Sequence, residues 1–167
     1  MSNKVLRNKI ADYLNLGTDT EEYHFMGMGF NTIDESKSPN VDSKTYIHQT
    51  TATKTVTGYE SSFAFDSDLI SDEAVIMDLY DIGVEEKTGA EAERDYVRVE
   101  LFRAVEGSEN TFRARKYRVS VECTDVTGAG GETVTVKGNL NSTTDVIKGT
   151  FNTSTKTFTA DTDAAAT

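Results

Sequence analysis

The chain of 167 residues carries a formal net charge of −11, with one cysteine and no tryptophan. Its length suits one ordinary domain with a sizeable core, and the lone Cys123 excludes an intrachain disulfide and a metal site built from cysteines alone. The acidity argues against affinity for nucleic acid, because binding phosphates requires cationic side chains.

The first third of the chain predicts a short helix, a strand and a long loop, in that order. Residues 3–16 predict the helix, whose apolar face would hold Leu6, Ile10, Tyr13 and Leu14. The apolar run 23–30 predicts a first strand, in which the glycines indicate a bulge or a close backbone approach. The polar segment 31–43 predicts a structureless loop of a length that is often functional.

The middle of the chain predicts two paired strands and the clearest helix. Residues 46–51 and 55–66 predict the strand pair, with Tyr59, Phe63 and Phe65 on one face of the second strand. Residues 71–73 (Ser-Asp-Glu) provide a cap and an acidic first turn for the helix, which Gly83 ends. The apolar side of this helix would be Val75, Ile76, Leu79 and Tyr80.

The second half predicts a polar segment and then strands. After the polar residues 85–94, two long strands would be joined by a hairpin loop at residues 106–110. Their buried faces would be Val97, Val99, Leu101 and Val105 on the first strand, and Tyr117, Val119, Val121 and Cys123 on the second. A glycine-rich turn at 128–131 leads into three short, threonine-rich strands up to residue 160. We expect about eight strands in all.

No residue pattern predicts catalytic, cofactor-binding or metal-binding residues. His24 and His48 lie in strand-like runs, and although a zinc site could use both with a carboxylate, nothing in the spacing brings them together. Cys123 is interpreted as a small buried residue rather than a reactive thiol. No apolar stretch approaches the roughly 20 residues of a membrane span and no signal-peptide core is visible, so we expect a soluble product made in the cytosol.

The charges are unevenly placed. Residues 60–95 hold twelve acids against Lys87 and Arg94, a net charge of −10, whereas residues 96–118 are mainly basic. The simplest interpretation is a solvated acidic helix beside a basic strand pair. An alternative is that acidic and basic surfaces meet across a subunit boundary and fix the register of an assembly.

Short motifs along the chain resemble the major tail tube proteins of long-tailed, siphophage-type phages and prophages of Gram-positive bacteria. The similarity covers roughly residues 3–160. In the closing strands, the similarity rests on three short motifs: Gly138-Asn139-Leu140, Gly149-Thr150-Phe151 and Thr155-Lys156-Thr157-Phe158-Thr159. Further matches are residues 3–5, 9–15, 26–32, 44–47, 57–60, 71–74 and 113–119.

The resemblance implies a mainly β fold, a sandwich that forms a barrel on assembly, with one flanking α-helix and a short N-terminal helix. We expect an N-terminal arm (1–20), a single tail tube domain (21–160) and a flexible C-terminal tail (161–167), which is expected from its small, polar composition and is not demanded by the resemblance. Six copies would form a ring, and stacked rings would make a tube in the virion tail through which double-stranded DNA passes without specific binding. No enzyme activity, cofactor or membrane is implied.

The resemblance also implies partners: further copies of the chain, and the tape measure, tail terminator and distal tail proteins. Segments 31–43 and 85–94 would order on contact with the next ring, and some acids of residues 60–95 would line the bore. Alternatives are the inner tube of a contractile tail or injection apparatus, and a monomeric β-sandwich that binds carbohydrates or surfaces.

Overall fold

The computed structural model describes residues 3–161, which contain eleven β-strands, one α-helix and two 3₁₀ turns. The strands are β1 (Ile10–Asn15), β2 (Tyr23–Phe25), β3 (Phe30–Ser36), β4 (Pro39–Lys44), β5 (Thr53–Tyr59), β6 (Ser62–Asp68), β7 (Glu93–Ala104), β8 (Thr111–Thr127), β9 (Thr135–Ser142), β10 (Ile147–Asn152) and β11 (Thr157–Ala160). The helix is α1 (Ala74–Val84), and the 3₁₀ turns are η1 (Arg7–Lys9) and η2 (Gly89–Ala92). The predicted mainly β class with one flanking α-helix is confirmed.

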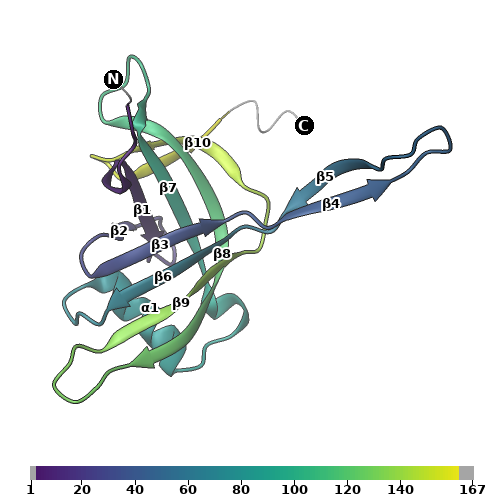
Figure 1. The fold of residues 1–167 in the computed structure, drawn as a ribbon. Coiled ribbons are helices and arrows are strands. Elements are labelled where there is room, and N and C mark those ends of the chain that lie inside the picture. Colours follow the sequence, from purple (N-terminus) through teal and green to yellow (C-terminus); the bar gives the residue numbers. More distant parts are fainter. Residues whose placement is uncertain (1–2, 162–167) are drawn as a thin grey trace.

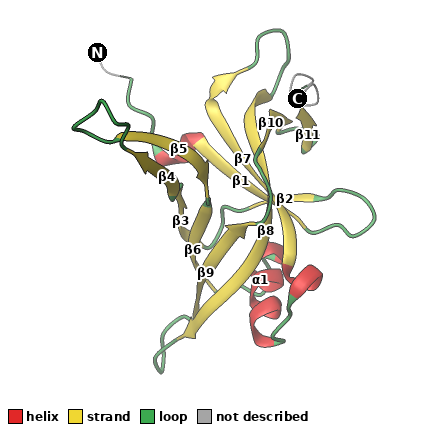
Figure 2. Cartoon of the chain, turned by 90° about the vertical axis from the view of Figure 1, so that its right-hand side faces the viewer, coloured by secondary structure: helices red, strands yellow, loops and turns green. Residues whose placement is uncertain are grey.

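Nine strands form one antiparallel sheet with the order β2-β1-β7-β8-β9-β6-β3, to which β10 and β11 are attached beside β8. The long strand β8 pairs with β10 through residues 111–116 and with β9 through residues 119–127. It thereby joins the two halves of the sheet, which diverge in Figure 2. Strands β4 and β5 form a separate two-stranded hairpin that projects from the sheet (Figure 1).

The core lies between the inner faces of the two halves of the sheet, with α1 behind β6 and β9 in Figure 1. Its centre is aromatic: the ring centroid of Phe63 lies 4.6 Å from that of Tyr96 and 4.9 Å from that of Tyr117. The helix contributes the fully or nearly buried side chains of Val75, Ile76, Leu79 and Ile82. A second, smaller cluster on the other face of β1 and β7 contains Tyr13, Val97, Val99 and Phe151.

The predicted helix over residues 3–16 is wrong. Only the single 3₁₀ turn η1 is present, and it is followed by β1, which pairs with β2 on one side and β7 on the other. Asp12 and Leu14 face the main core, and Ala11 and Tyr13 face the second cluster. Because both faces of β1 are buried, its sequence lacks the alternation that marks a half-exposed strand.

The predicted loop at 31–43 is also wrong, because most of it belongs to β3 and β4. The predicted strand at 46–51 is instead the tip of the projecting hairpin, and the predicted strand 55–66 is divided into β5 and β6. β5 pairs with β4, whereas β6 pairs with β3 and β9. Phe63 and Phe65 are buried as expected, but Tyr59 lies on the hairpin and is exposed.

The predicted strand 23–30 is only partly present, because β2 ends at Phe25 and a turn precedes β3, and the described residues hold eleven strands rather than about eight. Several other elements agree with the sequence. The helix begins and ends close to its predicted signals, although Glu73 stands at its N-cap and makes no side-chain capping bond. The hairpin of β7 and β8, the turn at 128–131 and the three closing strands are as predicted. The division into an arm, a domain and a tail stays a prediction, with the correction that residues 10–15 belong to the sheet, and residues 162–167 of the tail lie outside the described part of the chain.

Gly138 in β9 allows the close approach of β8 and should be hard to replace. A Cβ atom at this position would lie 2.0 Å from the carbonyl oxygen of Glu122. We expect Gly138→Ala to lower the free energy of unfolding by roughly 1–3 kcal/mol, the usual effect of overpacking, as measured by chemical denaturation. Gly58→Ala is the control, because a Cβ atom there meets no atom within 4 Å; equal effects of the two variants would contradict this account.

Candidate assembly surfaces

The β4–β5 hairpin is the most exposed structure in the described part of the chain. Its strands pair only with each other, and none of its residues is buried. Val41 and Val56, paired across the hairpin, are both about half exposed, and Ile47 at the tip is fully exposed. A two-stranded hairpin alone in water is marginally stable, so this one is a candidate for a contact that covers it.

The root of the hairpin is fixed to the sheet. The backbone N–H of Glu60 donates to the carbonyl oxygens of Lys37 and Ser38, at 3.2 Å each, and Ser38 has a positive φ of 39°. The Lys37 ammonium donates to the hydroxyl of Tyr117 at 3.0 Å. The two ends of the hairpin are thus bonded to each other, and Lys37 ties them to β8.

Lys37 lies at the exposed edge of a partly buried ion-pair cluster that joins four strands. We define this cluster as Asp12 of β1, Glu35 of β3, Arg98 of β7 and Arg115 of β8, with Lys37, Tyr96 and Tyr117 around them. Arg115 contacts Glu35 through two hydrogen bonds of 2.7 and 3.2 Å. Arg98 lies 3.5 Å from Asp12 and 3.8 Å from Glu35, and the hydroxyl of Tyr96 donates to Asp12.

The cluster controls the ionisation of Glu35. Burial alone would raise the pKa of Glu35, but hydrogen bonds from Arg115 and Lys37 outweigh it and lower the pKa from 4.5 to about 2. Since the folded-state pKa lies below that of the unfolded chain, Glu35 stabilises the fold above about pH 4.5. That contribution is lost as the pH falls toward 2.

A pH titration of stability tests this assignment. Between pH 6 and pH 2 we expect the wild-type chain to lose more free energy of unfolding than the Glu35→Gln variant, by on the order of 3 kcal/mol for a shift of this size. Denaturant titrations at several pH values measure the difference. Glu109→Gln, in the exposed β7–β8 loop, is the control. Parallel pH curves for the wild type and Glu35→Gln would contradict the assignment.

The outer face of β3, β6, β9 and the second half of β8 forms a second candidate surface, which we call the outer polar face. The strand registers place Asp34, Ala64, Asn139 and Glu122 in one row across it, and Ser36, Ser62, Asn141 and Ser120 in the next. A further row holds Thr32, Asp66 and Lys137. These side chains are short apart from Glu122 and Lys137, and none is aromatic or arginine.

The remaining sequence candidates do not come together. His24 lies 3.0 Å from Glu22 and His48 stacks on Tyr46, and residues 3–161 contain no group of side chains suited to a metal ion. Cys123 is partly buried against Gly83 of α1, and burial raises the pKa of its thiol. Within residues 3–161, the structure shows no helix that is both long and apolar enough to cross a membrane.

The acidic residues 60–95 are spread over several elements and do not form one surface. Asp66 and Asp68 lie on β6, whereas Asp78 and Asp81 lie on α1, where Asp78 forms two hydrogen bonds with Arg94. Some acids pair with the basic strands within the chain, as in the contact of Arg118 with Asp95. The alternative, a pairing across a subunit boundary, stays a prediction. The sequence does not reveal the ion-pair cluster, because its pattern predicts a helix at Asp12 and a loop at Glu35.

Comparison with known proteins identifies the fold. No protein family model and no curated protein sequence matches the chain. Among solved structures, the chain is similar to the SPP1 tail tube, with a TM-score of 0.66 and 10% identity over 97% of this chain and 84% of that chain.

Two further solved structures are similar to the chain. The anti-feeding prophage baseplate matches with a TM-score of 0.53 and 12% identity over 89% of this chain and 97% of that chain. The sheath/tube terminator of the extracellular contractile injection system PVC matches with a TM-score of 0.56 and 8% identity over 88% of this chain and 97% of that chain. The chain therefore has the fold found in tail tube proteins.

Proposed function

We propose that this chain is a structural virion protein, the major tail tube subunit of a siphophage-type tail, and not an enzyme. The observation that carries the proposal is the likeness of 97% of the chain to the SPP1 tail tube. The uncovered hairpin adds support, because tube subunits must contact further copies. Six copies would form a ring, and rings would stack into a tube in the virion tail, with the subunit synthesised in the cytoplasm of a bacterial host.

The outer polar face is the proposed lining of the bore. Its acids Asp34, Asp66 and Glu122 outnumber its single lysine, Lys137, so the surface repels phosphates. It presents no arginine or aromatic side chain on which a nucleotide could be held. Double-stranded DNA would slide along such a surface without specific binding. Of the acids in residues 60–95, this assigns Asp66 to the bore and leaves Asp78 and Asp81 on the helix.

The further partners follow from the place of a tube subunit in a tail. The ends of the tube would meet the tail terminator and the distal tail protein, and the tape measure protein would occupy the bore before DNA does. Segment 85–94 remains a proposed ring contact, because residues 85, 86 and 88–91 are exposed beside η2.

A second candidate is the inner tube of a contractile tail or injection apparatus. It is favoured by the matches to the anti-feeding prophage baseplate and the PVC terminator, although their TM-scores are lower than that of the SPP1 tail tube. Isolation of the chain from particles would separate the two, because a contractile tail also contains sheath subunits.

Electron microscopy of the purified, concentrated protein tests the proposal. We expect hollow tubes or six-fold rings in negative stain, together with a rise in particle mass by light scattering as the concentration increases. A monomer at every concentration, also in the presence of preformed tail ends from disrupted virions, would contradict the proposal. It would favour the alternative of a monomeric β-sandwich that binds carbohydrates or surfaces.

A further inference from the structure

The net charge of the chain is gathered toward one end of the molecule, although it is spread over several surfaces there. Residues 66–95 and 122–137 hold fourteen acids against Lys87, Arg94 and Lys137, a net charge of −11. The whole chain also carries −11, so the charges of all other residues sum to zero. Figure 1 and Figure 2 both place α1 at the end of the molecule away from the N-terminus and the β4–β5 hairpin.

The tip of the hairpin carries the opposite charge. Residues 44–54 contain Lys44 and Lys54 and no acid. The two lysines lie on the two paired strands, both are exposed, and neither forms an ion pair within the described part of the chain. Tyr46 and Ile47 are exposed between them. The tip therefore presents apolar side chains flanked by two unpaired ammonium groups.

The C-terminal end of α1 has the complementary pattern. Val84, the last residue of the helix, is 48% exposed, and Asp81, Glu85 and Glu86 are its acidic neighbours in the sequence. Glu85 pairs with Lys87 at 3.3 Å, whereas Asp81 and Glu86 have no cationic partner within residues 3–161. The last turn holds no basic residue, although the carbonyl groups at the end of a helix favour cations over acids.

The backbone of Glu86 makes an acid at this place still less favourable. Glu86 follows the C-cap residue Glu85 and has a φ of 53°, in the left-handed region where glycine is usual after a helix. Its N–H donates to the carbonyl oxygen of Gly83 at 3.2 Å. A cation from outside the chain would offset the electrostatic part of this cost.

Local charge separates Val84 from other exposed apolar side chains. Within three residues of Val84 the sequence holds three acids and one lysine, a net charge of −2. The side chains compared with it are Phe102, Val126, Val134, Val146 and Ile147. Each of these has one acid within the same span, and all but Val126 also have a base. A cationic apolar tip is therefore matched best at Val84.

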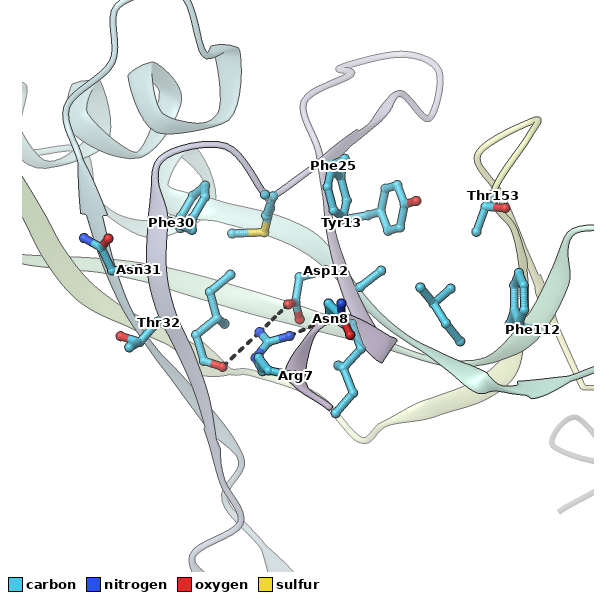
Figure 3. Close-up of a pocket in the computed structure, with 16 residues that line it drawn as sticks. Arg7, Asn8, Asp12, Tyr13, Phe25, Phe30, Asn31, Thr32, Phe112 and Thr153 are labelled. Carbon is cyan, nitrogen blue, oxygen red and sulfur yellow. Dashed lines mark hydrogen bonds and ion pairs between the residues drawn. The ribbon is translucent and has the colours of Figure 1, made fainter. Parts of the chain in front are cut away.

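The groove between β1 and β3 is a poorer match for such a tip. It has a volume of about 680 Å³, and the rings of Tyr13, Phe25 and Phe112 stand along it in Figure 3. Arg7 reaches across the groove to Asp12 at 2.8 Å. Because these two charges neutralise each other and Asp12 is buried, the groove has no acid left for an ammonium group.

We propose that the C-terminal end of α1 receives the hairpin tip of a second copy of the chain. The proposal rests on the proposed tube function and names the surface that its hairpin contacts. Charge complementarity selects this pair of surfaces: Lys44 and Lys54 of one copy face Asp81 and Glu86 of the next. The exposed apolar side chains of both surfaces pack between these charges, the arrangement usual in interfaces, with an apolar centre and a polar rim.

The contact is head-to-tail. The hairpin and α1 lie at opposite ends of the molecule in both views (Figure 1 and Figure 2), so the contact joins different copies. It leaves an unpaired hairpin at one end and an unpaired helix end at the other, so it repeats and builds a ring or a filament.

Charge reversal with rescue by mixing tests the proposal. One protein carries Lys44→Glu with Lys54→Glu, and a second carries Asp81→Lys with Glu86→Lys. All four residues are exposed or partly exposed, and circular dichroism checks that each variant folds. Alone, each protein brings like charges together, so we expect self-association, followed by light scattering over a concentration series, to be roughly tenfold weaker than in the wild type. In an equimolar mixture opposite charges meet again, and association returns to the wild-type level.

Lys4→Glu with Lys9→Glu is the matched control. It makes the same change in net charge as the hairpin variant, at two exposed lysines outside the hairpin. We expect this control to associate like the wild type. An equal loss of association in the control and the hairpin variant overturns the proposed contact.

The outcomes separate this inference from the proposed function. Rescue by mixing, with tubes in electron micrographs, supports both. Rescue without tubes supports the contact while the tube function fails. Tubes from the unmixed hairpin variant, or a loss that mixing does not restore, overturn the contact and leave the tube function standing. A wild-type chain that does not associate at any concentration overturns both.

Discussion

Replacing Arg98 with methionine is expected to lower the free energy of unfolding by about 3–5 kcal/mol, the usual effect of removing one partner of a buried ion pair. Arg98 is 5% exposed and faces the carboxylates of Asp12 and Glu35. Its loss removes the guanidinium that faces the carboxylate of Asp12, a residue that is itself only 2% exposed. Denaturant titration followed by circular dichroism measures the change.

Arg113→Met is the matched control for this prediction. Arg113 lies on β8 and pairs with Asp161 at 2.7 Å, but that pair is open to solvent, so screening by water leaves only a small effect. If the two arginine variants unfolded at the same denaturant concentration, the ion-pair cluster would not be a determinant of stability.

Replacing residues 42–55 with an Asn-Gly turn is expected to abolish tube assembly and leave the unfolding transition of the body unchanged. The strand pairing of the removed residues lies within the hairpin, and none of them is buried. The two retained strand ends would be closed by a two-residue turn of a type that suits a hairpin. Circular dichroism and denaturation measure the fold, and electron microscopy measures the tubes.

The deletion is confined to the hairpin because segment 31–43, the ring contact expected from the sequence, contains most of β3. Deleting the tip of residues 31–43 would remove part of β3, a strand of the main sheet, and would damage the fold itself. Ile47→Asp and Thr51→Asp form a matched pair of point variants, both exposed near the hairpin tip. Only the first should block assembly, and full-length tubes from the chain without the hairpin would show that another element stacks the rings.

The sequence correctly predicts the strands and the helix that have one buried face and one face exposed to solvent. In β8, buried Tyr117, Val119 and Val121 alternate with polar residues, and in β9 Val136 and Leu140 do the same. Helix α1 has clear start and stop signals. These elements were predicted close to their true bounds because local pattern and tertiary burial agree.

The errors arise where tertiary contacts override the local pattern. β1 is buried on both faces, and its Asp12 is tolerated there because Arg7, Tyr96 and Arg98 contact its carboxylate. The hairpin is not predicted for the opposite reason. Neither face of β4 or β5 is buried, so no alternation of apolar and polar residues marks these strands in the sequence. The groove joins β1 to β3 across the fold, a proximity that no local pattern encodes.

A cryo-EM reconstruction of the assembled protein tests the central claim most directly. We expect a hollow six-fold tube in which the outer polar face, with Asp34, Asp66 and Glu122, lines the bore. The hairpin of each subunit should contact a neighbouring copy. Particles that remain monomeric, or a tube whose bore is lined by other strands and carries positive charge, would contradict the account.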